Sequence, residues 1–300
     1  FIYYPGASVS WVLSEEPFFP ETNFLSNLRL RGALGKSGQR PGVRDAVTLF
    51  EPVSVASNNN EVSGVRLTAI GNPQLEPEKT TEYEAGFDAG LLADRLSLEF
   101  TWYTKKSQDA LVNRPLPPSY GLSGDGSPGA IWDNLGSIRN TGTELALNAR
   151  VLNRREAALN LRLTASTLTN EIEDMGEDIQ PIVFNRGNQQ HKEGYSAGGF
   201  FGRRITFTPP ASGGLLRPQD VSMVDDSVVF LGPSLPTNTQ ALSGDLSLFN
   251  NIVTISGLLE RRAGNKQLNY TEYFRCVSGY NNGVQGAARG QCDAVGNANA

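Results

Sequence analysis

The sequence has no run of about 20 consecutive apolar residues, the length that a membrane-spanning helix needs, although 39% of its 300 residues are hydrophobic. This absence excludes a helical membrane protein. It does not exclude a membrane β-barrel, because each barrel strand needs only about 10 residues and is apolar at every second position.

Histidine and the common catalytic motifs are also scarce. The single histidine, His191, stands in NQQHKEGY without a partner at the spacing of a zinc site or a catalytic triad. The sequence contains no G-x-S-x-G, H-E-x-x-H or P-loop motif, and the acids of RPQDVSMVDDSVVF lack the spacing of a calcium loop. We therefore expect no enzymatic activity, no metal site and no cofactor.

Positive charge is in deficit, with 26 Lys and Arg against 31 Asp and Glu and a net charge of -5. Phosphate binding normally requires a basic patch, and the arginines here are scattered along the chain. We expect no nucleic-acid partner.

Cysteine occurs only twice, at Cys276 and Cys292 in a Gly- and Asn-rich tail. This arrangement suits a loop-closing disulfide in an oxidising compartment, and two unrelated thiols are the alternative. The chain begins at Phe1 without a signal peptide and stops in the loop-like GNANA. We therefore expect a fragment of a longer protein.

Turn-forming residues are abundant, with 32 Gly and 17 Pro, and the apolar residues alternate with polar ones, as they do in β-strands. In EYEAGFDAGLLADRLSLEF, residues 82–100, the apolar residues keep this period on both sides of a break at Leu92–Arg95. The same pattern of two strands and a short turn recurs around residues 9–34, 144–164 and 242–259, the last with a turn at Asn250 and Asn251. The sequence predicts an all-β fold built from hairpins.

Long excursions separate these pairs, from Gly35 to about Asn72, from Ser107 to Asn140 and from Asn170 to about Thr239. Soluble domains rarely carry structureless loops beyond about 15 residues, whereas short periplasmic turns and long extracellular loops are typical of outer-membrane barrels. A soluble β-sandwich would show the same alternation with the apolar side chains inside. The unequal loops favour the barrel, with apolar side chains facing lipid and Glu84, Asp88, Arg150 and Arg162 facing the lumen.

Four blocks of the sequence carry a family resemblance. GNPQLEPEKTTEYEAGFDAGLLADRLSLEFTWYTKKSQDAL resembles a segment of TonB-dependent outer-membrane receptors, most closely the SusC/RagA-type TonB-linked transporters. SVSWVLSEEPFF with FLSNLRLRGALGKSGQ, NLGSIRNTGTELAL and VVFLGPSLPTNTQALSGDLSLF are similar to further strand pairs and strand entries of that family, in the same order.

The resemblance implies an antiparallel up-and-down transmembrane β-barrel of about 22 strands, of which residues 1–300 would supply roughly eight. The plug domain, the early strands and the terminal strand would lie outside this chain. It also implies a place in the outer membrane, in contact with its lipid, and active import of a bulky nutrient such as an oligosaccharide, a peptide or a siderophore-like ligand. TonB, a SusD-like surface lipoprotein and an extracellular nutrient are the expected partners. A passive porin-like or secretion barrel and a soluble, secreted, glycan-binding β-sandwich are the alternatives.

Aromatic residues of the long excursions are the candidates for ligand binding. Alternatively, they pack the loops against one another or against a partner lipoprotein. A second set near the strand ends, Trp11, Trp102 and Tyr103, is expected to belong to an interfacial aromatic girdle. The ligand-binding candidates are Tyr120, Trp132, Tyr195, Phe200 and Phe201.

Overall fold

The computed structural model describes residues 3–20, 22–57, 60–122, 129–176, 179–184, 188–208, 221–224 and 227–271. These residues divide into two compact units, which we treat separately. The first comprises Phe1–Ile182, Lys192–Ala197 and Pro236–Ala263, and the second comprises Val183–His191, Gly198–Leu235 and Gly264–Ala300.

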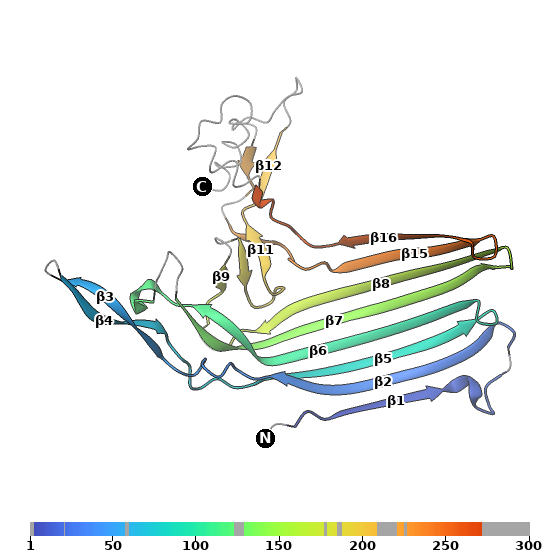
Figure 1. Ribbon diagram of the computed structural model, residues 1–300, viewed down its shortest axis with the longest axis horizontal. Coiled ribbons are helices and arrows are strands. Elements are labelled where there is room, and N and C mark those ends of the chain that lie inside the picture. Colours follow the sequence, from blue (N-terminus) through green and yellow to red (C-terminus); the bar gives the residue numbers. More distant parts are fainter. Residues whose placement is uncertain are drawn as a thin grey trace. The chain divides into compact units, whose positions relative to one another are not determined.

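The first unit is dominated by one eight-stranded sheet in the order β1-β2-β5-β6-β7-β8-β15-β16 (Figure 1). Every neighbouring pair is antiparallel, so the chain runs up and down as expected. The strands are β1 (Gly6–Val12), β2 (Leu25–Gln39), β5 (Glu78–Leu91), β6 (Leu96–Pro115), β7 (Ala130–Asn153), β8 (Ala157–Asp174), β15 (Asn238–Leu248) and β16 (Val253–Ala263).

Short turns join the paired strands at one end of the sheet, where the sequence predicts them. Residues Leu92, Ala93 and Asp94 between β5 and β6 have φ values of 56°, 55° and 58°. Phe249, Asn250 and Asn251 between β15 and β16 have φ values of 54°, 57° and 68°. The side chain of Arg150 donates to the carbonyl oxygen of Asp94, which ties the first turn to β7.

The long excursions contain more strand than the alternation predicts, so the expected extent of the loops is wrong. The expected loop from Ser107 to Asn140 is largely the paired outer halves of β6 and β7. The first excursion contains a separate hairpin of β3 (Leu49–Ser57) and β4 (Asn60–Ala69). The described residues of the first unit also include two short 3₁₀ helices, η1 (Leu13–Glu15) and η2 (Pro118–Tyr120).

The register of the sheet separates its side chains into an apolar face and a polar face. Phe87 and Phe100 are cross-strand partners on the apolar face, with ring centroids 5.7 Å apart. One row of that face runs across seven strands through Leu28, Ala89, Leu98, Leu147, Leu163, Leu242 and Leu259. Several of these side chains are exposed, Leu163 at 37%, Leu242 at 43% and Leu259 at 71%, as side chains directed at lipid would be in a protein viewed without its membrane.

The opposite face carries charges that link the strands. Asp88 on β5 pairs with both Arg29 and Arg31 on β2, with 3.0 Å between the carboxylate and the guanidinium nitrogen Nη2 of Arg31. Arg31 also donates to the hydroxyl of Thr101 on β6 at 3.2 Å. We assign this face to the barrel lumen, in agreement with the sequence prediction for Asp88.

Tyr103 is a correction to the predicted aromatic girdle. It is the cross-strand partner of Glu84 and Gly142 on the polar face, whereas Trp102 and Trp11 lie on the apolar face. Successive residues of a strand point to opposite faces, so the neighbours Trp102 and Tyr103 cannot both face lipid.

The described part of the second unit contains two small sheets of short strands. A four-stranded sheet has the order β14-β11-β10-β9, and β12 pairs with β13. The bounds are β9 (Ile182–Phe184), β10 (Gln189–His191), β11 (Gly199–Gly202), β12 (Ile205–Phe207), β13 (Val221–Met223) and β14 (Val229–Gly232).

A matched pair of arginine substitutions tests the assignment of the two faces. Leu145→Arg places a charge on the apolar face beside Phe100, whereas Ala146→Arg places it on the lumen face beside Glu99. In lipid vesicles, we expect Leu145→Arg to lower the free energy of unfolding of the full-length protein by about 2–4 kcal/mol and Ala146→Arg to have little effect. Equal effects in urea titrations would contradict the assignment.

Candidate functional site

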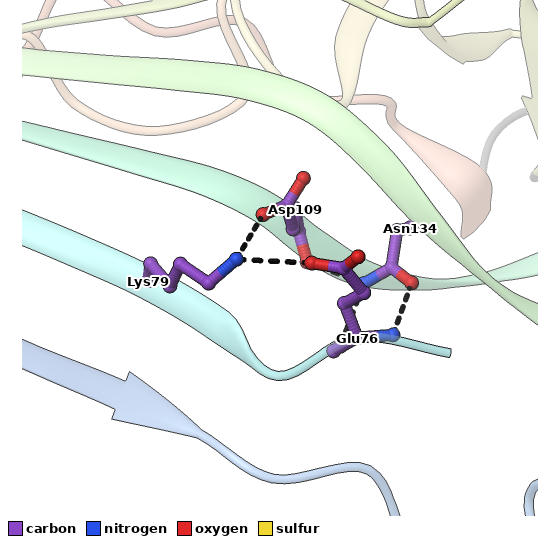
Figure 2. Close-up of polar contacts among 4 residues, drawn as sticks. All are labelled: Glu76, Lys79, Asp109 and Asn134. Atoms are coloured by element: carbon purple, nitrogen blue, oxygen red, sulfur yellow. Dashed lines mark hydrogen bonds and ion pairs between the residues drawn. The ribbon is translucent and has the colours of Figure 1, made fainter. Parts of the chain in front are cut away.

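The side chain of Asn134 fastens the Asn-Pro segment before β5 to β6 and β7 (Figure 2). Its amide oxygen accepts a hydrogen bond from the backbone N–H of Glu76 at 2.8 Å. Its amide nitrogen donates to the carbonyl oxygens of Glu76 at 2.8 Å and of Asp109 at 2.7 Å. Asn134 therefore satisfies both backbone groups of Glu76, as a neighbouring strand would.

Asp109 interrupts β6 at the same place. Its φ of 55° lies in the left-handed region, and the cross-strand partners pass from Gln108–Ser137 to Ala110–Leu135 without it. The pairing is interrupted there, and the Asp109 carbonyl accepts a hydrogen bond from the Asn134 side chain. The Lys79 ammonium bridges the carboxylates of Glu76 at 3.0 Å and Asp109 at 3.2 Å. Since these groups are exposed, we attribute orientation rather than much stability to the ion pairs.

Other residues of the recognised strand entry also fasten the chain. The Asn140 amide oxygen accepts from Asn170 at 2.7 Å, and Asn170 in turn accepts from the backbone N–H of Ala197 at 2.7 Å. Gly142 leaves room for the ring of Tyr103, since a Cβ at Gly142 would lie 2.6 Å from the Tyr103 hydroxyl oxygen. These motif residues position strands and loops, and none of them needs a ligand to explain it.

A charged cluster marks the outer end of the apolar face. Lys106 and Arg139 continue the alternating set that carries Leu98 and Leu147 lower down, and both pair with Glu173. The Lys106 nitrogen lies 2.7 Å from the Glu173 carboxylate. Between the aliphatic rows and this cluster, threonine hydroxyls pair across strands, Thr104 with Thr141 at 3.1 Å and Thr143 with Thr167 at 2.7 Å. This gradient from aliphatic to charged side chains places the outer boundary of the hydrocarbon layer near Lys106.

The ligand-binding candidates are divided between the two units. In the first unit, Tyr120 is 54% exposed in η2, and Trp132 is 37% exposed on β7 with its carbonyl accepting from Asn72. The centroid of the Tyr195 ring lies 5.3 Å from the ammonium of Lys192. The backbone carbonyl of Tyr195 accepts a hydrogen bond from the backbone N–H of Ile172.

Phe200 and Phe201 are adjacent on β11 in the second unit and face opposite ways. Phe201 is only 3% exposed and packs on Phe230, with centroids 5.4 Å apart. Phe200 lies instead beside a hollow lined by residues 189, 200, 234, 266–268 and 270. The ligand role of all five aromatic candidates stays a prediction.

His191 ends β10 in the second unit and is half-buried. Its Nδ1 accepts a hydrogen bond from the N–H of Gly198 at 3.1 Å, which requires the neutral ring with its proton on Nε2. Burial lowers the pKa of His191 below its usual range. We therefore assign a structural role to His191 in the four-stranded sheet β14-β11-β10-β9, which we call the loop sheet.

Several residues of these sites were not expected to matter from the sequence. Asn134 was visible only as the first asparagine of NLGSIRNTGTELAL, and nothing in the sequence links it to Glu76. No motif or pattern in the sequence marks Lys266 or Tyr270. Among the described residues, no group of three or more His, Cys, Asp or Glu is placed to hold a metal ion. Cys276, Cys292 and the acids Asp220, Asp225 and Asp226 lie outside the described residues, so the disulfide stays a prediction.

Comparison with known proteins identifies related chains. Residues 2–251 match the family model described as "TonB dependent receptor-like, beta-barrel". The chain is 26% identical to TonB-dependent receptor P3 of Formosa agariphila over 82% of its length and 23% of that receptor's. It is 30% identical to TonB-dependent receptor SusC of Bacteroides thetaiotaomicron over 66% of its length and 21% of that receptor's.

Solved structures share the fold. The RagAB peptide importer in its "closed-closed" state superposes with a TM-score of 0.74 at 19% identity, covering 90% of this chain and 30% of that one. The chain thus spans roughly a quarter of the length of the relatives that it matches.

We expect Asn134→Ala to loosen the Asn-Pro segment. The substitution removes three hydrogen bonds, and at about 0.5–1.5 kcal/mol each, with partial replacement by water at this exposed site, we expect a local loss of about 1–2 kcal/mol. Hydrogen exchange of residues 74–79 in the full-length protein should then be about tenfold faster. Asn113→Ala, at an exposed position of β6, is the matched control. Unchanged exchange in Asn134→Ala would contradict the role of Asn134.

The loop sheet should lose stability in mild acid. The folded pKa of His191 is lowered, so the folded state binds fewer protons, and the stability that neutral His191 contributes is present above about pH 6.5 and lost as the pH falls below it. Hydrogen exchange of residues 189–202, corrected for its intrinsic pH dependence, should be faster at pH 5.5 than at pH 7.5. In His191→Asn, which keeps an acceptor but does not titrate, this difference should vanish, and its persistence would rule out His191 as the cause.

Proposed function

The chain belongs to the TonB dependent receptor-like β-barrel family, an outer-membrane family, and we propose from this premise that the whole protein imports a bulky nutrient across the outer membrane with energy from TonB. The observation that carries the proposal is the antiparallel sheet with one apolar and one charged face. Such a sheet suits the wall of a barrel between lipid and a wet lumen.

We assign residues 1–300 to the barrel wall and its outer loops. In the order of the sheet, β1 and β16 are the terminal strands, and we propose that both pair with strands of the longer protein. The plug domain and the TonB-contacting segment would lie in that longer protein. Among the described residues, few hydrophobic side chains are buried, which supports a wall whose lumen face is covered by another domain.

The relatives support a bulky nutrient. SusC is a TonB-dependent receptor and RagAB is a peptide transporter, and by analogy we propose an oligosaccharide, a peptide or a similar ligand, captured together with a SusD-like surface lipoprotein. The family mechanism is gating by the plug, which exposes its TonB-contacting segment when ligand binds. In that mechanism the wall stays rigid. The ion pairs of Asp88 with Arg29 and Arg31 join β5 to β2, the hydrogen bond of Arg31 to Thr101 reaches β6, and these links serve this rigidity.

Uptake of labelled oligosaccharides and peptides by cells tests the proposal. We expect the intact gene to confer uptake of at least one of them, and deletion of TonB to abolish that uptake without removing the receptor from the outer-membrane fraction. Uptake that persists without TonB would point to a passive porin-like barrel. Full-length protein that remains soluble without detergent would overturn the membrane assignment.

A further inference from the structure

The hollow in the second unit lies beside a glycine, Gly232, on strand β14. On the central strand β11, Phe200 has Gln189 of β10 as its cross-strand partner on one side and Gly232 of β14 on the other. Gly232 has a φ of 146°, which side chains rarely allow, and a Cβ there would lie 2.7 Å from Cγ of Lys266. The backbone at Gly232 therefore leaves the space beside Phe200 to the stem of Lys266.

Backbone contacts hold Lys266 in this position. Its N–H donates to the carbonyl of Pro233 at 2.7 Å, and the side chain of the preceding Asn265 donates to the carbonyl of Ser234 at 3.5 Å. The segment after β16 is thus anchored to the segment after β14. The backbone of Lys266 is thereby held beside the hollow that this residue lines.

The chemistry of the lining is selective. The hollow has a volume of about 510 Å³, within the range of small-molecule sites. It combines the aromatic rings of Phe200 and Tyr270 with the amides of Gln189 and Gln267 and the hydroxyl of Ser234. Among the described residues that line it, Lys266 is the one cation, and no carboxylate faces it.

Resting on the proposed function, we propose that this hollow binds a sugar ring that carries an acidic group, as part of an anionic oligosaccharide. The C–H groups on one face of a pyranose suit the electron-rich face of an aromatic ring. Amide and hydroxyl groups match sugar hydroxyls, and the Lys266 ammonium supplies a charge-assisted hydrogen bond to a carboxylate or sulfate. A neutral sugar would leave Lys266 without this partner.

Titration calorimetry on the full-length receptor in detergent tests the inference. The acidic probes are oligogalacturonate, alginate oligosaccharides and chondroitin sulfate oligosaccharides, and maltohexaose and a galacto-oligosaccharide are the neutral ones. We expect at least one acidic probe to bind. Phe200→Ala should weaken that binding by about tenfold, and Lys266→Gln by about fivefold or more, whereas Lys266→Arg should stay within about threefold of wild type.

Phe50→Ala, at an exposed aromatic residue of β3, and Lys36→Gln, at a lysine of β2, are the matched controls and should leave the affinity unchanged. Failure of all three acidic probes to bind, or wild-type affinity in both Phe200→Ala and Lys266→Gln, would overturn the inference. The inference would also be overturned if a neutral probe bound as tightly as the acidic ones and Phe200→Ala abolished that binding. TonB-dependent uptake of any nutrient would leave the proposed function standing in each of these cases.

Discussion

The fold depends on one constraint, which is that a strand exposed to lipid has no water to satisfy its backbone. Every N–H and C=O in the membrane layer must then find a partner on a neighbouring strand, so the strands are long, antiparallel and joined by the shortest turns that the backbone allows. The positive φ values at the β5–β6 and β15–β16 turns show that these short turns require strained backbone conformations. Cross-strand pairing, rather than burial in a core, holds the eight-stranded sheet together.

Some strands are longer than a bilayer requires. A bilayer-spanning barrel strand needs about 9–11 residues, but β6 has 20 and β7 has 24. Along the apolar face the side chains change from leucine to paired threonines and then to the Lys106–Glu173–Arg139 cluster, which would be costly inside hydrocarbon. We therefore infer that the outer halves of β6 and β7 extend beyond the hydrocarbon layer.

The sequence predicts the parts of this structure that depend on local pattern. Alternation located four strand pairs and their two faces, and the Asn250–Asn251 pair located a turn. Alternation does not predict strands whose side chains follow no period of two. Residues 107–115 mix charged, polar and apolar side chains, so the sequence does not indicate their pairing with β7. Trp102 and Tyr103 are neighbours in the sequence but point to opposite faces of the sheet, so the predicted place of Tyr103 in the girdle is wrong. The contacts of Asn134 with Glu76 join residues 58 positions apart, and no local pattern encodes such a distance.

Three of the residues that carry the family resemblance have structural roles. Asn134 satisfies the backbone of Glu76, Asn140 connects to the loop through Asn170, and Gly142 admits the ring of Tyr103. These roles are the same whatever nutrient passes, so the motif reports the architecture and is silent about the substrate. Selectivity must then come from other side chains. Around the hollow, Phe200 and Lys266 lie outside the four blocks, whereas Gly232 and Ser234 belong to the last of them.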